Sequence, residues 1–188
     1  PDADGELWWH AVLEESITHT IGVSEDLRDG VRLSIEILAN EVVTRRQDKA
    51  LTPLPADQAQ PLAQQALRFL YRILFLLYAE ASPELGVLPI GAPEYAQGYS
   101  LDRLRDLVQV ELATPQARSG THLYDSLGVL FRLVDSGHSP KRPGIDDLEQ
   151  GDDGSAFGEG LTFNSLRADL FAPRATRHID DVGLGNAA

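Results

Sequence analysis

Apolar positions are densest at residues 67–78, LRFLYRILFLLY, where ten of twelve residues are apolar or aromatic and the other two are Arg68 and Arg72. A helix that is apolar nearly all round is either a core helix or a membrane span, and this run is shorter than the ~20 residues that a span needs. We therefore expect a central core helix at 57–81, ended by Ser82-Pro83. Leu67, Leu70, Leu74 and Leu77 occupy one face of this helix, Phe69, Ile73 and Leu76 occupy much of another, and we expect both faces to be buried.

Shorter apolar stripes predict four further helices. They lie at residues 6–20, 24–43, 100–108 and 120–137, with Gly22 ending the first, Ser24 and Ser100 as N-caps, and Gly137 as a C-cap. Gly30 lies inside the second, where glycine costs about 1 kcal/mol, so we expect close packing against it. The predicted fold class is mainly α: an irregular helical bundle of about five helices around a central apolar helix, with a loop-rich C-terminal third.

The last third of the chain differs in composition. Residues 138–160 are rich in glycine, other turn formers and acids, which is typical of a flexible loop. We therefore divide the chain into a helical domain at 1–137, this acidic Gly-rich loop at 138–160, and a segment at 161–188 that leads toward a missing downstream domain. The stretch LTFNSLRADLF in that segment predicts a short strand or a helical turn, and the pattern does not choose between them.

Composition narrows the function classes. The net charge of −13 disfavours a stand-alone nucleic-acid binder, because neutralising phosphate supplies most non-specific affinity. The absence of cysteine excludes disulfides, a thiol nucleophile and Cys-containing zinc sites. No segment predicts a membrane span, so we expect a cytoplasmic chain with protein partners. Methionine is absent even at position 1, which indicates a piece of a longer protein.

No pattern of acids, histidines or glycines predicts a catalytic, cofactor-binding or metal site in this chain. The five histidines form neither HxxxH nor HExxH. The acids at 146–153 do not have the spacing of an EF-hand loop, and GSAFGEG lacks the flanking strand and helix of a phosphate loop. An enzyme that uses scattered carboxylates with His19 or His122 is the weakest alternative, and a deep pocket beside either histidine would favour it.

Six arginines are candidates for contacts with DNA phosphate or with another domain. Arg68 and Arg72 lie four apart and so share a helix face, from which their stems follow apolar surface while the guanidinium groups reach out. They either pair with acids such as Glu80 or Asp106, or contact phosphate or another domain. Four further candidates either touch backbone phosphate or are solvated, namely Arg45, Arg46, Arg174 and Arg177.

Several phrases occur together in a fixed order. ALRFLYRILFLLYAEA is followed by GVLPI, and then by GYSLDRLRDLV, THLYDSLGVLFRLVDSG and LRADLFAPRAT. Together they resemble a helical region of large single-chain adenine-specific DNA methyltransferases, which include fused restriction–modification enzymes and related phage-defence methyltransferases. In that family an arginine-bearing, leucine-rich helix ends in YAE and precedes GLLP, and an LF-D/A-P phrase lies just ahead of the catalytic domain. The resemblance covers roughly residues 60–180.

The chain lacks the parts of that family that carry out the reaction. The Asn-Pro-Pro-Tyr/Phe phrase that holds the flipped adenine, the Gly-rich S-adenosylmethionine loop and the nuclease motif are absent from the sequence. The resemblance therefore implies a connector that orients a catalytic domain, with S-adenosylmethionine and DNA bound by the parent enzyme and no catalytic residue in this chain. The alternative is a free-standing helical module that binds a protein, which a large exposed apolar patch would favour.

Overall fold

The structure is a computed structural model that describes residues 3–139 and 161–188, with side chains described from residue 25. It is mainly helical, which confirms the predicted fold class. The α-helices are α1 (Ala3–Asp48), α2 (Ala59–Ala81), α3 (Pro93–Gly98), α4 (Leu101–Val108), α5 (Pro115–Ser119), α6 (His122–Ser136) and α7 (Arg177–Asp180). Short 3-10 helices lie at Ala56–Gln58, Pro83–Leu85 and Pro173–Thr176. The only β pairing among the described residues is an isolated bridge between His138 and Phe163.

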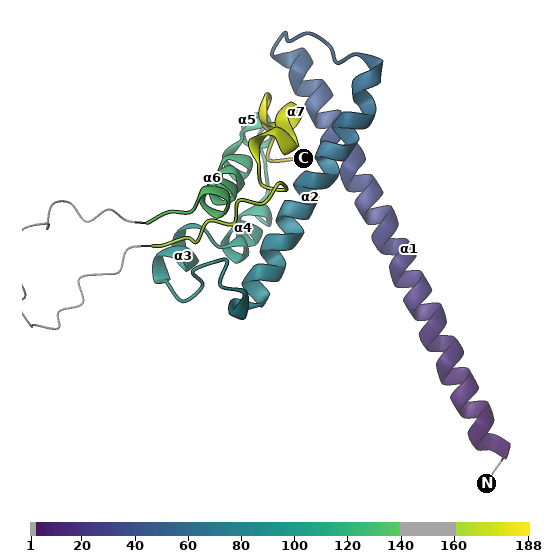
Figure 1. Cartoon of the computed structure of the whole chain (residues 1–188). Helices are drawn as coiled ribbons and strands as arrows, with labels where there is room; N and C mark the ends of the chain where they lie inside the picture. Colours follow the sequence, from purple (N-terminus) through teal and green to yellow (C-terminus); the bar gives the residue numbers. More distant parts are fainter. Residues whose placement is uncertain (1–2, 140–160) are drawn as a thin grey trace, which may run out of the picture.

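A single helix, α1, replaces the two helices predicted at 6–20 and 24–43. Gly22 does not end it, because glycine weakens a helix without preventing its hydrogen bonds, and no proline interrupts residues 3–48. At 1.5 Å per residue its 46 residues span about 70 Å, and its N-terminal part projects away from the other helices (Figure 1). Gly30 has nothing within 4 Å of the position that a Cβ would take, so the close packing expected there is wrong.

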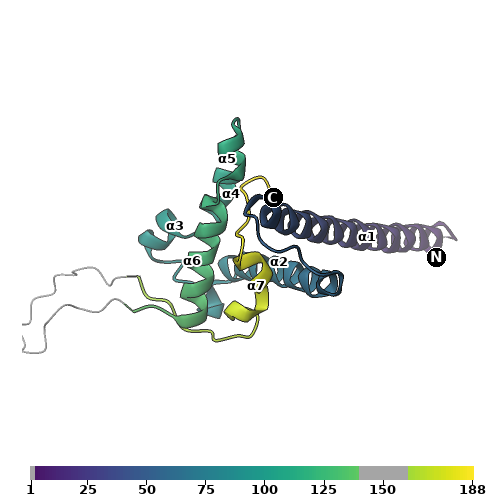
Figure 2. The same ribbon diagram turned by 90° about the horizontal axis from the view of Figure 1, so that it is seen from above.

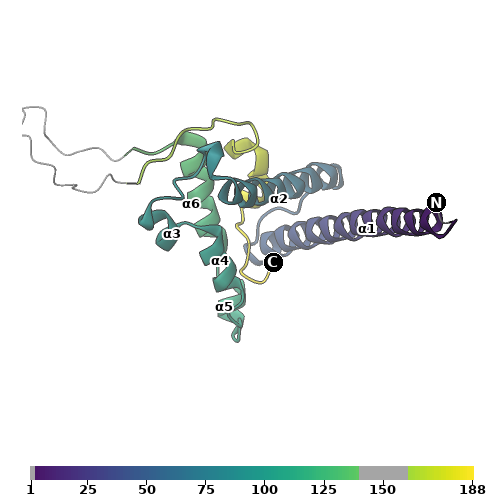
Figure 3. The ribbon, with the colours of Figure 1, turned by 90° about the horizontal axis from the view of Figure 1, so that it is seen from below.

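The central element is α2, as predicted, and it begins and ends close to the expected 57–81. It packs against α1, α4, α7 and the turn at Pro173–Thr176. Figures 2 and 3 show α1 on one side of α2, with α3 and α6 on the other. None of the helices in the described part of the chain combines the length and the apolar character that crossing a bilayer requires.

The buried face of α2 is not the leucine face. Leu74 and Leu77 are 50% and 46% exposed, so their expected burial is wrong. Because nearly every position of α2 is apolar, the pattern identifies the helix but not its rotation. The ring of Phe69 points inward, where it packs on the rings of Tyr124 and Phe131 of α6. The residues that are buried recur three or four apart, as Leu62, Ala66, Phe69, Arg72, Leu76 and Ala79.

The caps predicted for α4 and α6 are confirmed. The hydroxyl of Ser100 accepts a hydrogen bond from the backbone N–H of Arg103 at 3.2 Å. Gly137 ends α6 with a φ of +75°, and a Cβ there would lie 3.0 Å from the carbonyl oxygen of Phe163. The helices α3 and α5 were not predicted, because each is only six or five residues long and so shows no apolar period.

The C-terminal segment, 161–188, packs into the same core as the helices. Phe163, Phe171, Ile179 and Leu184 are all buried. The stretch LTFNSLRADLF is neither a strand nor a helical turn, since Phe163 makes only a single β-bridge and the chain otherwise runs irregularly to a turn. The loop predicted at 138–160 lies outside the described residues, apart from positions 138 and 139.

A pair of leucine-to-alanine substitutions tests the assignment of the two faces of α2. Leu76→Ala removes a fully buried side chain and is expected to lower the free energy of unfolding by roughly 2–5 kcal/mol. Leu74→Ala lies on the half-exposed face and is expected to change that free energy by less than about 1 kcal/mol. Urea unfolding followed by circular dichroism measures both values, and equal losses would contradict the assignment.

Candidate functional site

Arg72 is buried in the core, where it binds the C-terminal segment. Its side chain is 3% exposed, Nε donates to the carbonyl oxygen of Leu170 at 2.7 Å, and Nη2 donates to that of Ala172 at 2.9 Å. The guanidinium also lies over the rings of Phe131 and Phe171, with Cζ 5.2 and 5.9 Å from the ring centres. We call this arrangement the Arg72 clamp. The expectation that Arg72 reaches outward is therefore wrong.

The positive charge of Arg72 is balanced by the dipoles of the two carbonyl groups and by more distant acids. Burial lowers the pKa of Arg72 below its usual value, while the charge of Asp180 acts in the opposite direction. An arginine stays protonated despite such a shift, so the two carbonyl groups accept charge-assisted hydrogen bonds. Neither Glu80 nor Asp106, the acids that the sequence suggested as partners, forms an ion pair with Arg72 in the described structure.

Of the other five candidate arginines, three have a hydrogen-bond or ion-pair partner and two are exposed without an ion pair among the described residues. Arg45 Nη1 donates to the carbonyl oxygen of Ser119 at 3.0 Å, and Arg46 donates twice to that of Thr52 at 3.1 and 2.8 Å. Arg174 forms an exposed ion pair with Asp169. The side chains that lie exposed and without an ion pair among the described residues are Arg68 and Arg177.

Glu80, the acid of the YAE phrase, connects α2 to α3 and α4. Its Oε1 accepts hydrogen bonds from the hydroxyl of Tyr95 at 2.6 Å and from the backbone N–H of Leu101 at 2.7 Å. Burial raises the pKa of Tyr95 well above its usual value, and the hydrogen bond to Glu80 raises it further. Tyr95 therefore stays a neutral donor, and the contact is structural.

The C-terminal residues are tied to α1, α5 and α6 by backbone hydrogen bonds. Glu41 accepts from the N–H of Gly185 at 3.0 Å, and Lys49 donates to the carbonyl oxygen of Val182 at 2.7 Å. The N–H of Asn186 donates to the carbonyl oxygen of Gly120 at 2.8 Å. A Cβ on Gly185 would lie only 2.7 Å from Glu41 Oε1, so glycine permits this close approach.

Polar side chains elsewhere in the described part of the chain form hydrogen-bonded pairs. Tyr124 donates to Asp180 at 2.6 Å, and Thr176 donates to the other oxygen of Asp180 at 2.9 Å. Burial, and then the bond to Asp180, raises the pKa of Tyr124 above its usual value. Nδ1 of His122 lies 2.7 Å from Nδ2 of Asn186, with no carboxylate in that pair. Within the described residues, no three acids or histidines gather closely enough to hold a metal ion.

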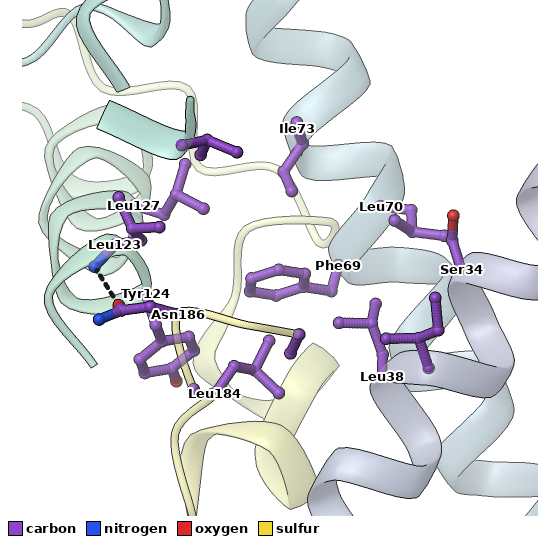
Figure 4. A pocket seen from close by; sticks show the side chains of 14 residues that line it. Ser34, Leu38, Phe69, Leu70, Ile73, Leu123, Tyr124, Leu127, Leu184 and Asn186 are labelled. Carbon is purple, nitrogen blue, oxygen red and sulfur yellow. Dashed lines mark hydrogen bonds between the residues drawn. The ribbon is translucent and has the colours of Figure 1, made fainter. Parts of the chain in front are cut away.

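An apolar groove lies where α1 and α2 face α6, the end of α4 and the C-terminal segment. It has a volume of about 330 Å³ and opens to solvent. Its walls include Ser34 and Ile37 of α1 and Leu70 and Ile73 of α2 (Figure 4). At its floor Phe69 lies beside Leu38, and Leu123, Tyr124 and Leu184 close the far side. We call this the α1–α2 groove.

Exposed apolar side chains continue from the α1–α2 groove along both helices. Leu27 is 65% exposed and Ile37 is 43% exposed on α1, and Val108 at the end of α4 is 64% exposed. On α2, Leu74 and Leu77 follow Leu70 by four and seven residues and so share its face. These apolar side chains are therefore exposed to solvent in the described part of the chain.

Sequence reasoning found the residues of this surface but assigned them to the core. The leucine face of α2 is apolar enough to be buried. The spacing of its residues does not reveal that this face stays uncovered in the described part of the chain. The signal that was available is the excess of apolar positions on α2, since one helix cannot bury all its faces in a domain with so few large helices.

Comparison of the chain with known proteins gave no match to a family model, a curated protein or a solved structure.

Two arginines one turn apart provide a matched test of the Arg72 clamp. Arg72→Ala leaves two buried carbonyl groups without their donor and opens a cavity, so we expect a loss of roughly 2–5 kcal/mol in the free energy of unfolding. Arg72→Lys should also destabilise, because an ammonium group cannot reproduce the planar two-pronged geometry. Arg68→Ala should change the free energy by less than about 0.5 kcal/mol. Equal effects at both positions in chemical denaturation would contradict the clamp.

Proposed function

We propose that this chain is a helical connector in a DNA adenine-N6 methyltransferase of a restriction–modification or phage-defence system. S-adenosylmethionine and the target adenine are bound by other parts of the parent enzyme, and this chain orients the catalytic domain. Its partners are the neighbouring domains of the parent, and DNA is reached through the parent. Because the parent enzyme would modify DNA, its proposed location is the cytoplasm.

One observation carries this proposal: the Arg72 clamp joins two phrases of the resemblance that are about a hundred residues apart. Arg72 comes from the leucine-rich helix, and the carbonyl groups that it binds belong to Leu170 and Ala172 of the LFAP phrase. In the family that the chain resembles, this phrase lies just ahead of the catalytic domain. The clamp therefore holds the two phrases together in one folded body, on which a neighbouring catalytic domain could be oriented.

Contact with DNA phosphate is a smaller part of the proposal. Arg45, Arg46 and Arg72 are occupied by backbone carbonyl groups, so they are poor candidates for phosphate contacts. Arg68 lies about one helical turn from Gln65. Because the side chain of Gln65 accepts a hydrogen bond from the backbone N–H of His178, the neighbouring Arg177 is close to the same part of α2. If the connector touches a DNA backbone, these two exposed arginines are the side chains to do it.

A second candidate function is a free-standing protein-interaction module, and the exposed apolar face of α2 favours it. Tyr71, Leu74, Leu77 and Tyr78 are all between 46% and 61% exposed. A connector also needs such a face to contact a neighbouring domain, so the observation fits both functions. The two differ in whether the partner is on the same polypeptide.

Methyl transfer by the parent enzyme tests the proposed function. The purified parent is expected to transfer a labelled methyl group from S-adenosylmethionine to adenine N6 in duplex DNA, whereas this chain alone is expected to bind no S-adenosylmethionine in calorimetry. Tyr78→Glu in the parent should slow methylation, because it disrupts the exposed face of α2 that contacts the neighbouring domain. Leu85→Glu, at an exposed position outside α2, serves as the matched control.

Absence of adenine methylation by the parent would overturn the proposal, as would saturable binding of S-adenosylmethionine to this chain alone. If Tyr78→Glu and Leu85→Glu slowed methylation equally, the contact assigned to α2 would be wrong.

A further inference from the structure

Asn186 of the C-terminal segment is buried at the junction of α5 and α6, where its side-chain amide has three neighbours. Oδ1 accepts a hydrogen bond from the backbone N–H of Leu123 at 3.1 Å (Figure 4). Nδ2 donates to the carbonyl oxygen of Ala117 at 2.8 Å and lies 2.7 Å from Nδ1 of His122. The two backbone partners fix the amide, because turning it over would set oxygen against oxygen and N–H against N–H.

The orientation of this amide determines the protonation state of His122. Nδ2 of Asn186 carries hydrogens and cannot accept a hydrogen bond, so the ring nitrogen that faces it must offer a lone pair. Nδ1 of His122 is therefore unprotonated, and the neutral ring carries its proton on Nε2. A proton on Nδ1 would set one donor against another, and the contact between the two side chains would be lost.

His122 lies where a change in pH can act on it. The residue is exposed, so solvent delivers a proton to the ring directly. Histidine is the side chain that ordinarily changes charge between about pH 5 and 8. We propose that the contact between His122 and Asn186 is a pH-sensitive latch, in which protonation of Nδ1 loosens the C-terminal segment from the junction of α5 and α6.

The charged groups around this latch do not replace the lost contact. The elements that meet here carry Asp125 on α6, Arg118 on α5, Glu41, Arg45 and Lys49 on α1, and Asp180 and Asp181 on the C-terminal segment. None of these acids forms an ion pair with His122 in the described structure. Asp125 accepts a hydrogen bond from the hydroxyl of Thr121 at 2.8 Å, and Glu41 pairs with Arg45.

The direction of the effect follows from which form takes up the proton. The closed latch keeps Nδ1 unprotonated, whereas the open latch leaves it free to bind a proton. Opening therefore becomes easier as the pH falls, and the latch is fully formed above about pH 8. The backbone N–H groups of Asn186 and Gly185 keep their bonds to Gly120 and Glu41. Acid pH therefore raises the population of the open form without releasing the segment completely.

The residues that the latch holds also form one side of the α1–α2 groove. Leu184, Gly185 and Asn186 belong to its lining, and Figure 4 shows Leu184 and Asn186 beside Tyr124. Loosening the segment at acid pH would therefore widen the groove on this side. The latch consists of residues of this chain alone, so it does not depend on the reaction of the parent enzyme.

Two NMR measurements on the whole 188-residue chain test the latch. Two-bond correlation spectra of the histidine rings at about pH 7.5 are expected to place the proton of His122 on Nε2. Hydrogen exchange of the backbone amide of Asn186, corrected for the intrinsic pH dependence of exchange, is then compared at about pH 7.5 and about pH 5.5. The protection of this amide should fall by about tenfold at the lower pH, as expected for the loss of one hydrogen bond.

Two histidine substitutions separate the latch from other titrations. His122→Gln keeps a neutral acceptor, so the tenfold difference between the two pH values should disappear. His178→Gln is the matched control, because Nε2 of His178 lies 3.3 Å from Oε1 of Gln58, an oxygen that accepts from a neutral or a protonated ring alike. This variant should keep the pH dependence of the unaltered chain. Circular dichroism checks that both variants fold.

Three results would overturn the proposal. The first is a proton on Nδ1 of His122 in the folded chain at about pH 7.5, which needs no variant to observe. The second is protection of Asn186 that falls equally in the unaltered chain and in His122→Gln. The third is a pH dependence that His178→Gln abolishes and His122→Gln keeps, which would assign it to the other histidine.

Discussion

The packing of residues 161–188 depends on the hydrogen bonds of a charged guanidinium inside the core, that of Arg72. Removing an arginine from water is costly unless hydrogen bonds replace the solvent. The carbonyl groups of Leu170 and Ala172 provide that replacement, and the rings of Phe131 and Phe171 cover the guanidinium. An irregular segment offers free carbonyl groups that a regular helix would use internally, which explains why residues 161–188 can pack here without forming a long helix of their own.

Several structural features could be predicted from the sequence because local chemistry determines them. The extent of α2, the serine cap of α4 and the glycine end of α6 follow from proline, serine and glycine at defined positions. The rotation of α2 does not follow, because a helix that is apolar on most faces can bury any of them. The Arg72 clamp was also beyond prediction, since its partners are backbone carbonyl groups about a hundred residues away and carbonyl groups have no sequence pattern.

The two faces of α2 give the chain an inner and an outer role. The inner face, with Phe69 and Arg72, holds α6 and the C-terminal segment together. The outer face carries exposed apolar side chains, Tyr71, Leu74, Leu77 and Tyr78. Glu80, Tyr95 and Tyr124 form hydrogen bonds between elements of the fold.

Because Arg72 joins residues 161–188 to α2, we expect the two to open as one cooperative unit. Native-state hydrogen exchange tests it directly, because it gives the free energy of opening for each amide. The N–H groups of Gly183 and Asn186, which donate to Ile179 and Gly120, should exchange with the same opening free energy as the amides in the middle of α2. Opening of the C-terminal amides at a free energy lower by about 2 kcal/mol or more, with α2 still protected, would contradict the account.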